Sequence, residues 1–90
     1  MYNLNTIGRE LLKSKFNISE VFAKEIIYVR ENYTKRGFKN KKDLYDTMFT
    51  YYSNISDKTT KFTQEKIQAF NAYFGSLELA MSKDERLVIE

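Results

Sequence analysis

The chain has 90 residues, a formal net charge of +3, and neither cysteine nor histidine. This length predicts one domain, and the missing residue types exclude disulfides, zinc sites and the common catalytic dyads and triads. Proline is absent and glycine occurs only three times, which favours helices over a turn-rich sheet. We therefore expect an all-α fold, a small bundle of about four helices forming a single domain over residues 1–90.

The first helix is predicted over residues 4–14. Leu4, Ile7 and Leu11 recur there at the three- and four-residue intervals of one helix face.

The second helix is predicted over residues 19–36. Ser19 is suited to the N-cap, because its hydroxyl can accept a hydrogen bond from an N–H group of the first turn. Gly37 is suited to follow the C-terminus, since glycine adopts the left-handed conformation without strain. The apolar face of this helix, which we interpret as core, consists of Phe22, Ile26, Val29 and Tyr33.

Two further helices are predicted over residues 40–54 and 63–81. Asn40 and Asp43 have the spacing of a capping box at the start of the third helix. The fourth helix has the clearest apolar stripe in the chain. This stripe consists of Ile67, Phe70, Phe74, Leu77 and Met81.

The segment over residues 82–90 is a flexible or docking tail in this interpretation. Residues 87–89 are apolar, and two of the three are β-branched. The tail can extend the fourth helix, add a strand or dock on a partner.

Residues suited to catalysis are scarce. The glycines lie at positions 8, 37 and 75, so no glycine-rich phosphate loop exists. Asp43 and Asp46 are three apart and can share a cation, but this spacing is common on exposed helix surfaces. We expect no enzymatic activity, no metal site and no cofactor.

The most informative feature is the run from Lys35 to Lys42. It contains five of the 15 basic residues in eight positions and no acidic residue. Because it lies at the joint between two predicted helices, it can hold phosphate groups; a solvated polar turn is the alternative. The nucleic-acid contacts expected from this run and its surroundings are Arg30, Lys35, Arg36, Lys39, Asn40, Lys41 and Lys42.

The segment YTKRGFKNKKDLYDTMFTYY (33–52) resembles the ribbon-helix-helix DNA-binding family. The likeness extends over residues 13–53: a helix, a Gly-hydrophobic turn, a polar-basic cap and an amphipathic second helix. It implies that amides of residues 40–42 clamp a phosphate and that residues 13–18 form a short DNA-reading strand. In that strand Lys13 and Lys15 lie on one side and are further expected nucleic-acid contacts. The predicted helix before Gly37 is longer than is usual in that family, which also has no long helix before its strand or after its second helix.

A second likeness covers nearly the whole chain. Ile18-Ser19, the Gly37 turn, Tyr51-Tyr52 and residues 65–74 resemble small helical double-stranded-DNA-binding proteins of tailed phages. This likeness and the Asn/Lys/Tyr/Ile-rich composition imply a phage or mobile-element protein.

Three functions follow in order of preference. The first is a DNA-binding regulator of transcription, a homodimer that contacts double-stranded DNA. The second is a phage-type inhibitor that blocks a host or defence protein, such as an acidic or nucleic-acid-binding protein. The third is a self-associating architectural bundle. The expected interface residues are Tyr45, Tyr52, Phe70, Tyr73, Phe74 and Leu77.

The N-terminus has no basic segment followed by an apolar one, so no secretory signal is visible. No apolar run approaches the roughly 18–20 residues that a membrane span requires. We expect a protein of the cytoplasm of a bacterial host that has no membrane partner.

Overall fold

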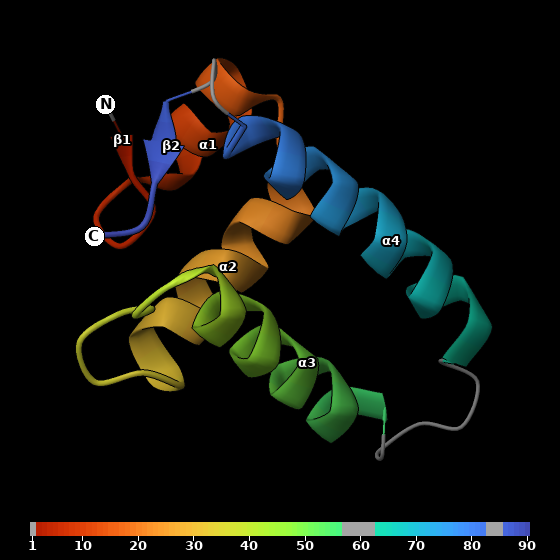
Figure 1. The fold of residues 1–90 in the computed structure, drawn as a ribbon. Coiled ribbons are helices and arrows are strands. Elements are labelled where there is room, and N and C mark those ends of the chain that lie inside the picture. Colours follow the sequence, from red (N-terminus) through yellow and green to blue (C-terminus); the bar gives the residue numbers. More distant parts are fainter. Residues whose placement is uncertain (1, 57–62, 83–85) are drawn as a thin grey trace.

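The computed structural model describes residues 2–56, 63–82 and 86–90, and for residues 56 and 63–70 it describes the backbone alone. The fold is a small helical bundle with one short parallel sheet, which confirms the predicted all-α class (Figure 1). None of the described helices is long and apolar enough to cross a bilayer. The elements are β1 (Tyr2–Asn3), α1 (Arg9–Phe16), α2 (Glu20–Asn32), α3 (Lys41–Ser56), α4 (Thr63–Ala80) and β2 (Leu87–Val88).

The sheet joins the two ends of the sequence. Tyr2 pairs with Leu87 and Asn3 with Val88 in a parallel register, so two strands from opposite ends of the sequence lie side by side (Figure 1). Of the three alternatives for the tail, the added strand is the one found, and it docks on its own chain. Leu87 is buried at 2% exposure, which gives the strand an apolar anchor.

α1 begins at Arg9, not at residue 4. Leu4 and Ile7 are buried, as their spacing predicted, but they lie in a turn in which the N–H of Ile7 donates to Asn3 O at 2.9 Å. Gly8 is extended and forms the N-cap. Pairing of β1 with the distant β2 holds this segment out of the helix.

The predicted strand over residues 13–18 is wrong. Residues 13–16 belong to α1, and Asn17 adopts a left-handed conformation with φ 54° that ends the helix. Leu12 and Phe16, four positions apart, are both buried, so a helical face positions this segment.

α2 begins as predicted but ends early. Ser19 Oγ accepts from the N–H of Phe22 at 3.2 Å, which confirms the cap. The helix ends at Asn32, four residues before the predicted end. Thr34 causes this, because its hydroxyl donates to Arg30 O at 2.7 Å and accepts from Gly37 N at 2.9 Å. The backbone after Asn32 therefore folds into a side-chain-stabilised loop.

α3 begins with the predicted pair of capping residues. Asn40 Oδ1 accepts from the N–H of Asp43 at 2.8 Å. Asp43 Oδ2 accepts in return from the N–H of Lys39 at 2.9 Å, one residue earlier than an ordinary capping box reaches. Both ends of the connection between α2 and α3 are thus fixed by side chains.

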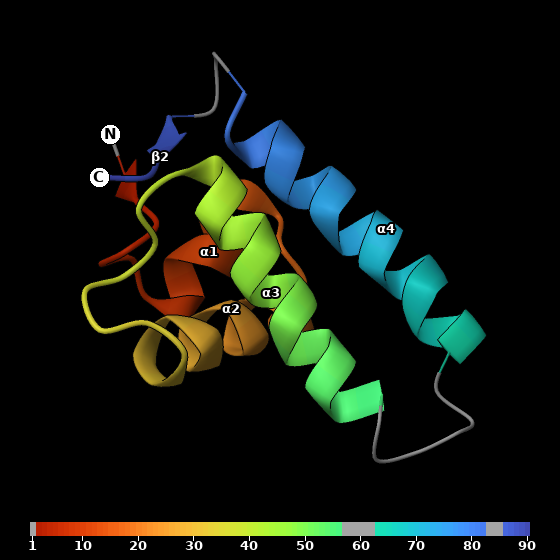
Figure 2. The same ribbon diagram turned by 60° about the horizontal axis from the view of Figure 1, so that its bottom comes forward.

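The core lies where α1, α3 and the C-terminal half of α4 meet α2. Its fully buried members include Leu12, Phe22, Ile26, Met48 and Leu77. Each such side chain contributes about 1.5–3 kcal/mol of burial free energy. α3 and α4 run in opposite directions, and the connection between α2 and α3 lies on the opposite side of the molecule from α4 (Figure 2).

Gly37→Ala should destabilise the fold. Gly37 has φ +85°, and an added Cβ would lie 2.5 Å from Asn5 Oδ1. We expect the free energy of unfolding to fall by about 1–3 kcal/mol in urea denaturation. The control is Gly75→Ala in α4, where nothing lies within 4 Å of the added atom; it should raise stability by about 0.5–1 kcal/mol. Equal stability of the two variants would contradict the close approach of Asn5 to the loop.

Candidate nucleic-acid interface

The segment over residues 33–40, here called the basic loop, joins α2 to α3 (Figure 2). Two anchors fix it to the rest of the chain. Phe38 is buried at 2% exposure. Asn5 pairs with the Phe38 backbone, accepting from its N–H at 2.7 Å and donating to its carbonyl at 2.8 Å. The loop therefore has a defined conformation although most of its side chains are exposed.

Three cations project from this fixed loop. Lys35, Arg36 and Lys39 are exposed, and within residues 2–55, 71–82 and 86–90 none of them forms an ion pair. All three line one hollow of about 710 Å³. The other lining residues are Tyr33, Thr34, Gly37, Phe38, Asp43, Thr47 and Glu90.

Two further cations of the run are paired with carboxylates that lie outside the run. Lys41 Nζ lies 2.7 Å from Glu78 Oε2 on α4. Lys42 Nζ lies 2.9 Å from Asp46 Oδ2 one turn along α3, and this hydrogen bond raises the pKa of Lys42. Both pairs are exposed to solvent, so each contributes little to stability and can exchange for another anion.

Arg30, a predicted nucleic-acid contact, is engaged within the fold. Its side chain is only 11% exposed. Nη1 donates to Leu4 O at 3.0 Å and to Ile7 O at 2.8 Å. The guanidinium therefore satisfies the carbonyls of the N-terminal turn and ties that turn to α2.

The remaining predicted contacts are dispersed. Lys13 lies 3.3 Å from Glu20 Oε1, linking α1 to α2, and its hydrogen bond is the main reason that the pKa of Glu20 is lowered. Lys15 is exposed on α1. Asn40 uses its side-chain oxygen to cap α3. Because residues 13–18 form no strand, Lys13 and Lys15 do not belong to a DNA-reading ribbon.

The predicted interface residues on α4 pack within the chain. Leu77 is fully buried, so it contributes nothing to the surface. Tyr73 stacks on Phe22 with ring centroids 4.8 Å apart, and Phe74 lies 5.5 Å from the same ring. The Phe70 side chain lies outside the described part of the chain, as does Ile67. The homodimer stays a prediction, and part of its expected seam serves the core of the single chain.

Tyr45 and Tyr52 are half-buried on α3. The Tyr45 hydroxyl donates to the carboxylate of Glu78, and burial, followed by this bond, raises the pKa of Tyr45. Burial and the nearby carboxylate of Glu25 likewise raise the pKa of Tyr52. Both rings therefore stay neutral and serve mainly to join α3 to its neighbours.

The exposed aromatic cluster of Tyr28, Tyr33 and Tyr51 was missed from the sequence. Their ring centroids lie 5.6–6.4 Å apart. Tyr28 is 51% exposed and Tyr33 is 37% exposed. Helical spacing assigned Tyr33 to the core face, but α2 ends at Asn32 and the ring turns outward. The only signal for an exposed ring was its position beside the basic run.

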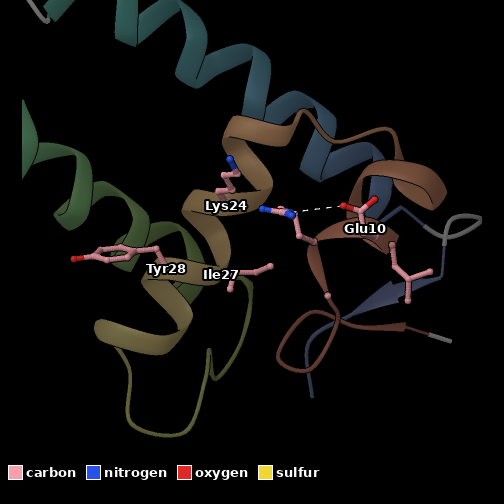
Figure 3. A pocket seen from close by; sticks show the side chains of 7 residues that line it. Glu10, Lys24, Ile27 and Tyr28 are labelled. Atoms are coloured by element: carbon pink, nitrogen blue, oxygen red, sulfur yellow. Dashed lines mark ion pairs between the residues drawn. The ribbon is translucent and has the colours of Figure 1, made fainter.

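A second hollow, of about 500 Å³, lies between α1 and α2. Its apolar lining includes Leu11, Ile27 and Tyr28. Ile27 points from α2 toward α1, whereas Tyr28 points away toward α3 (Figure 3). An ion pair between Arg9 and Glu10, 3.7 Å long, lies at the edge of the hollow (Figure 3).

No cluster of three acidic side chains suited to a metal ion occurs among the described residues. Asp43 caps α3 and Asp46 pairs with Lys42, so both carboxylates are engaged. Each of the two therefore has a role in the fold that does not involve a metal ion.

No protein-family profile, curated protein or solved structure matches this chain. The candidate site is therefore defined by the basic loop, its three exposed cations and the adjoining tyrosines.

Glu78→Gln tests the link between α3 and α4. The pKa of Glu78 lies below its ordinary 4.5, first because of the hydrogen bond from Lys41 and then because of that from Tyr45. A lowered pKa means that the ionised form stabilises the fold, an effect present above pH 4.5 and lost as the pH falls through the lowered value. The stability difference between the wild type and Glu78→Gln should therefore shrink as urea denaturation is repeated from about pH 7 to about pH 3.

Lys41→Gln supplies the matched background. In the Lys41→Gln background, the change in unfolding free energy caused by Glu78→Gln should depend less on pH. A double-mutant cycle measures this difference. A difference that is constant across the pH range would show that Glu78 contributes no charge-dependent stability.

Proposed function

We propose that the protein binds nucleic acid through phosphate contacts made by the basic loop. The observation that carries this proposal is the set of three exposed cations without ion pairs in the described residues, Lys35, Arg36 and Lys39, around one hollow. Lysine and arginine bound to phosphates release condensed counterions, which is the main source of affinity in such contacts.

The fixed backbone of the loop supports the same proposal. Asn5 and Phe38 hold the loop in one conformation before any partner arrives. Less conformational entropy is then lost on binding than in a mobile basic tail. Lys41 and Lys42 can add to the site, because their exposed ion pairs are weak enough for phosphates to compete with Asp46 and Glu78.

The biological setting in this proposal is a regulatory protein of a phage or mobile element in the bacterial cytoplasm. The two sequence resemblances and the composition support that setting. The absence of a strand at residues 13–18 removes direct base readout by a ribbon, so the proposed contacts are to the backbone of the nucleic acid.

Reversal of the three loop charges should abolish binding. We expect the variant with Lys35, Arg36 and Lys39 all changed to Glu to lose detectable affinity for DNA at about 50 mM salt, by fluorescence anisotropy. Changing the same residues to Gln should make the plot of log affinity against log salt less steep by about 2–3.

The control reverses an equal number of exposed cations elsewhere: Lys15, Lys24 and Arg86. None of them forms an ion pair within the part of the chain that the structure describes. This variant carries the same net charge and should keep most of the affinity. Equal losses in both variants, or no binding by the wild type, would refute a specific role for the loop.

The apolar hollow between α1 and α2 favours a second function, the binding of a host or defence protein. Leu11 lines this hollow and is 38% exposed, so Leu11→Glu should leave the core intact. Val21→Glu is the control, at an exposed apolar residue outside the hollow. We expect the wild type and Val21→Glu to elute from size exclusion in a stoichiometric complex with a protein of the host extract. Leu11→Glu should not form this complex. A complex that both variants retain would exclude the hollow as its interface.

A further inference from the structure

We propose that the basic loop takes single-stranded nucleic acid, whose bases stack on the exposed rings of Tyr28 and Tyr33. The inference rests on the proposed nucleic-acid-binding function and names its substrate class. Proteins that bind single strands combine a positive surface with aromatic side chains on which successive bases stack.

The two components of such a site adjoin each other here. Tyr33 lines the same hollow as Lys35, Arg36 and Lys39. The two residues from Tyr33 to Lys35 span at most about 7 Å. A nucleotide whose phosphate contacts Lys35 or Arg36 therefore has its base within reach of the Tyr33 ring.

The tyrosine rings are held in place but not covered. Tyr33 packs edge-on against Tyr51 at 90° with centroids 5.6 Å apart, and its hydroxyl accepts from Asn54 Nδ2 at 3.3 Å. Tyr28 lies 5.7 Å from the Tyr51 ring. Because these contacts fix the rings and leave Tyr28 51% and Tyr33 37% exposed, stacking a base costs little additional ordering.

The surroundings suit an unpaired base better than a duplex. A smaller hollow of about 220 Å³ beside Tyr33 is lined by Asp46, Thr47 and Thr50, whose polar groups can meet a base edge. In a duplex, the base faces are stacked on one another and unavailable to a tyrosine. Of the acidic residues that line these two hollows, Asp46 is paired with Lys42 and Asp43 accepts from the N–H of Lys39, while Glu90 lines the larger hollow.

The test compares four probes of about 12 nucleotides with the full chain at about 50 mM salt. The probes are an oligo-dT strand, an oligo-U strand, a DNA duplex, and an abasic strand that keeps every phosphate but no base. Tyr33→Leu and Tyr28→Leu remove a ring, whereas Tyr33→Phe keeps one and serves as the matched control. Thermal unfolding checks that each variant remains folded.

We expect oligo-dT or oligo-U to bind more tightly than the duplex and the abasic strand. Each Leu variant should lose roughly tenfold in affinity for the single strand, and Tyr33→Phe should bind like the wild type. Whichever of oligo-dT and oligo-U binds with the higher affinity indicates whether the preferred strand is DNA or RNA. The abasic strand should bind the Leu variants and the wild type equally.

Two outcomes would overturn the inference and are distinguishable from failure of the proposed function. If the duplex or the abasic strand binds as tightly as oligo-dT and oligo-U, and reversal of the loop charges abolishes that binding, phosphate contact stands and base stacking fails. If folded Leu variants bind the single strands like the wild type, stacking also fails. If no probe binds, the proposed function and the inference fall together.

Discussion

The carboxamide of Asn5 is the interaction on which the geometry of this protein depends. Its oxygen accepts from the N–H of Phe38, and its nitrogen donates to the main-chain oxygens of Phe38 and Glu90. One side chain thus joins the N-terminal turn, the basic loop and the C-terminal segment. Gly37 makes room for it, because any side chain there would collide with the carboxamide. The loop has no partner strand, and the Asn5 amide instead satisfies both the N–H and the carbonyl of Phe38.

The parts of the fold that follow from local physics could be predicted from the sequence. The cap at Ser19, the capping pair Asn40 and Asp43 and the extent of α4 depend on residues a few positions apart. The start of α1 depends on pairing between β1 and β2, which lie at opposite ends of the sequence. Spacing alone therefore predicted the burial of Leu4 and Ile7 correctly but their conformation wrongly.

The candidate site shows why a linear charge pattern differs from a surface potential. The run from Lys35 to Lys42 contains no acid, yet Glu78 approaches Lys41 from α4 across 37 positions of sequence. The Arg30 guanidinium donates to the carbonyls of Leu4 and Ile7, which are distant from it in sequence, so it does not add to the exposed positive surface. Tyr33 is exposed because a threonine side chain ends α2 early. The first two differences arise from tertiary contacts, and the third arises from local hydrogen bonds of Thr34.

The parallel pairing of β1 with β2 also determines the order in which parts of the protein can form. α2 and α3 are adjacent in sequence, so their packing closes a short loop, whereas the strand pair closes nearly the whole chain and carries the largest entropic cost. Asn5 is two residues from this pair. Fraying of the two ends would therefore release the basic loop while the helical core persists, which couples the conformation of the loop to the integrity of the termini.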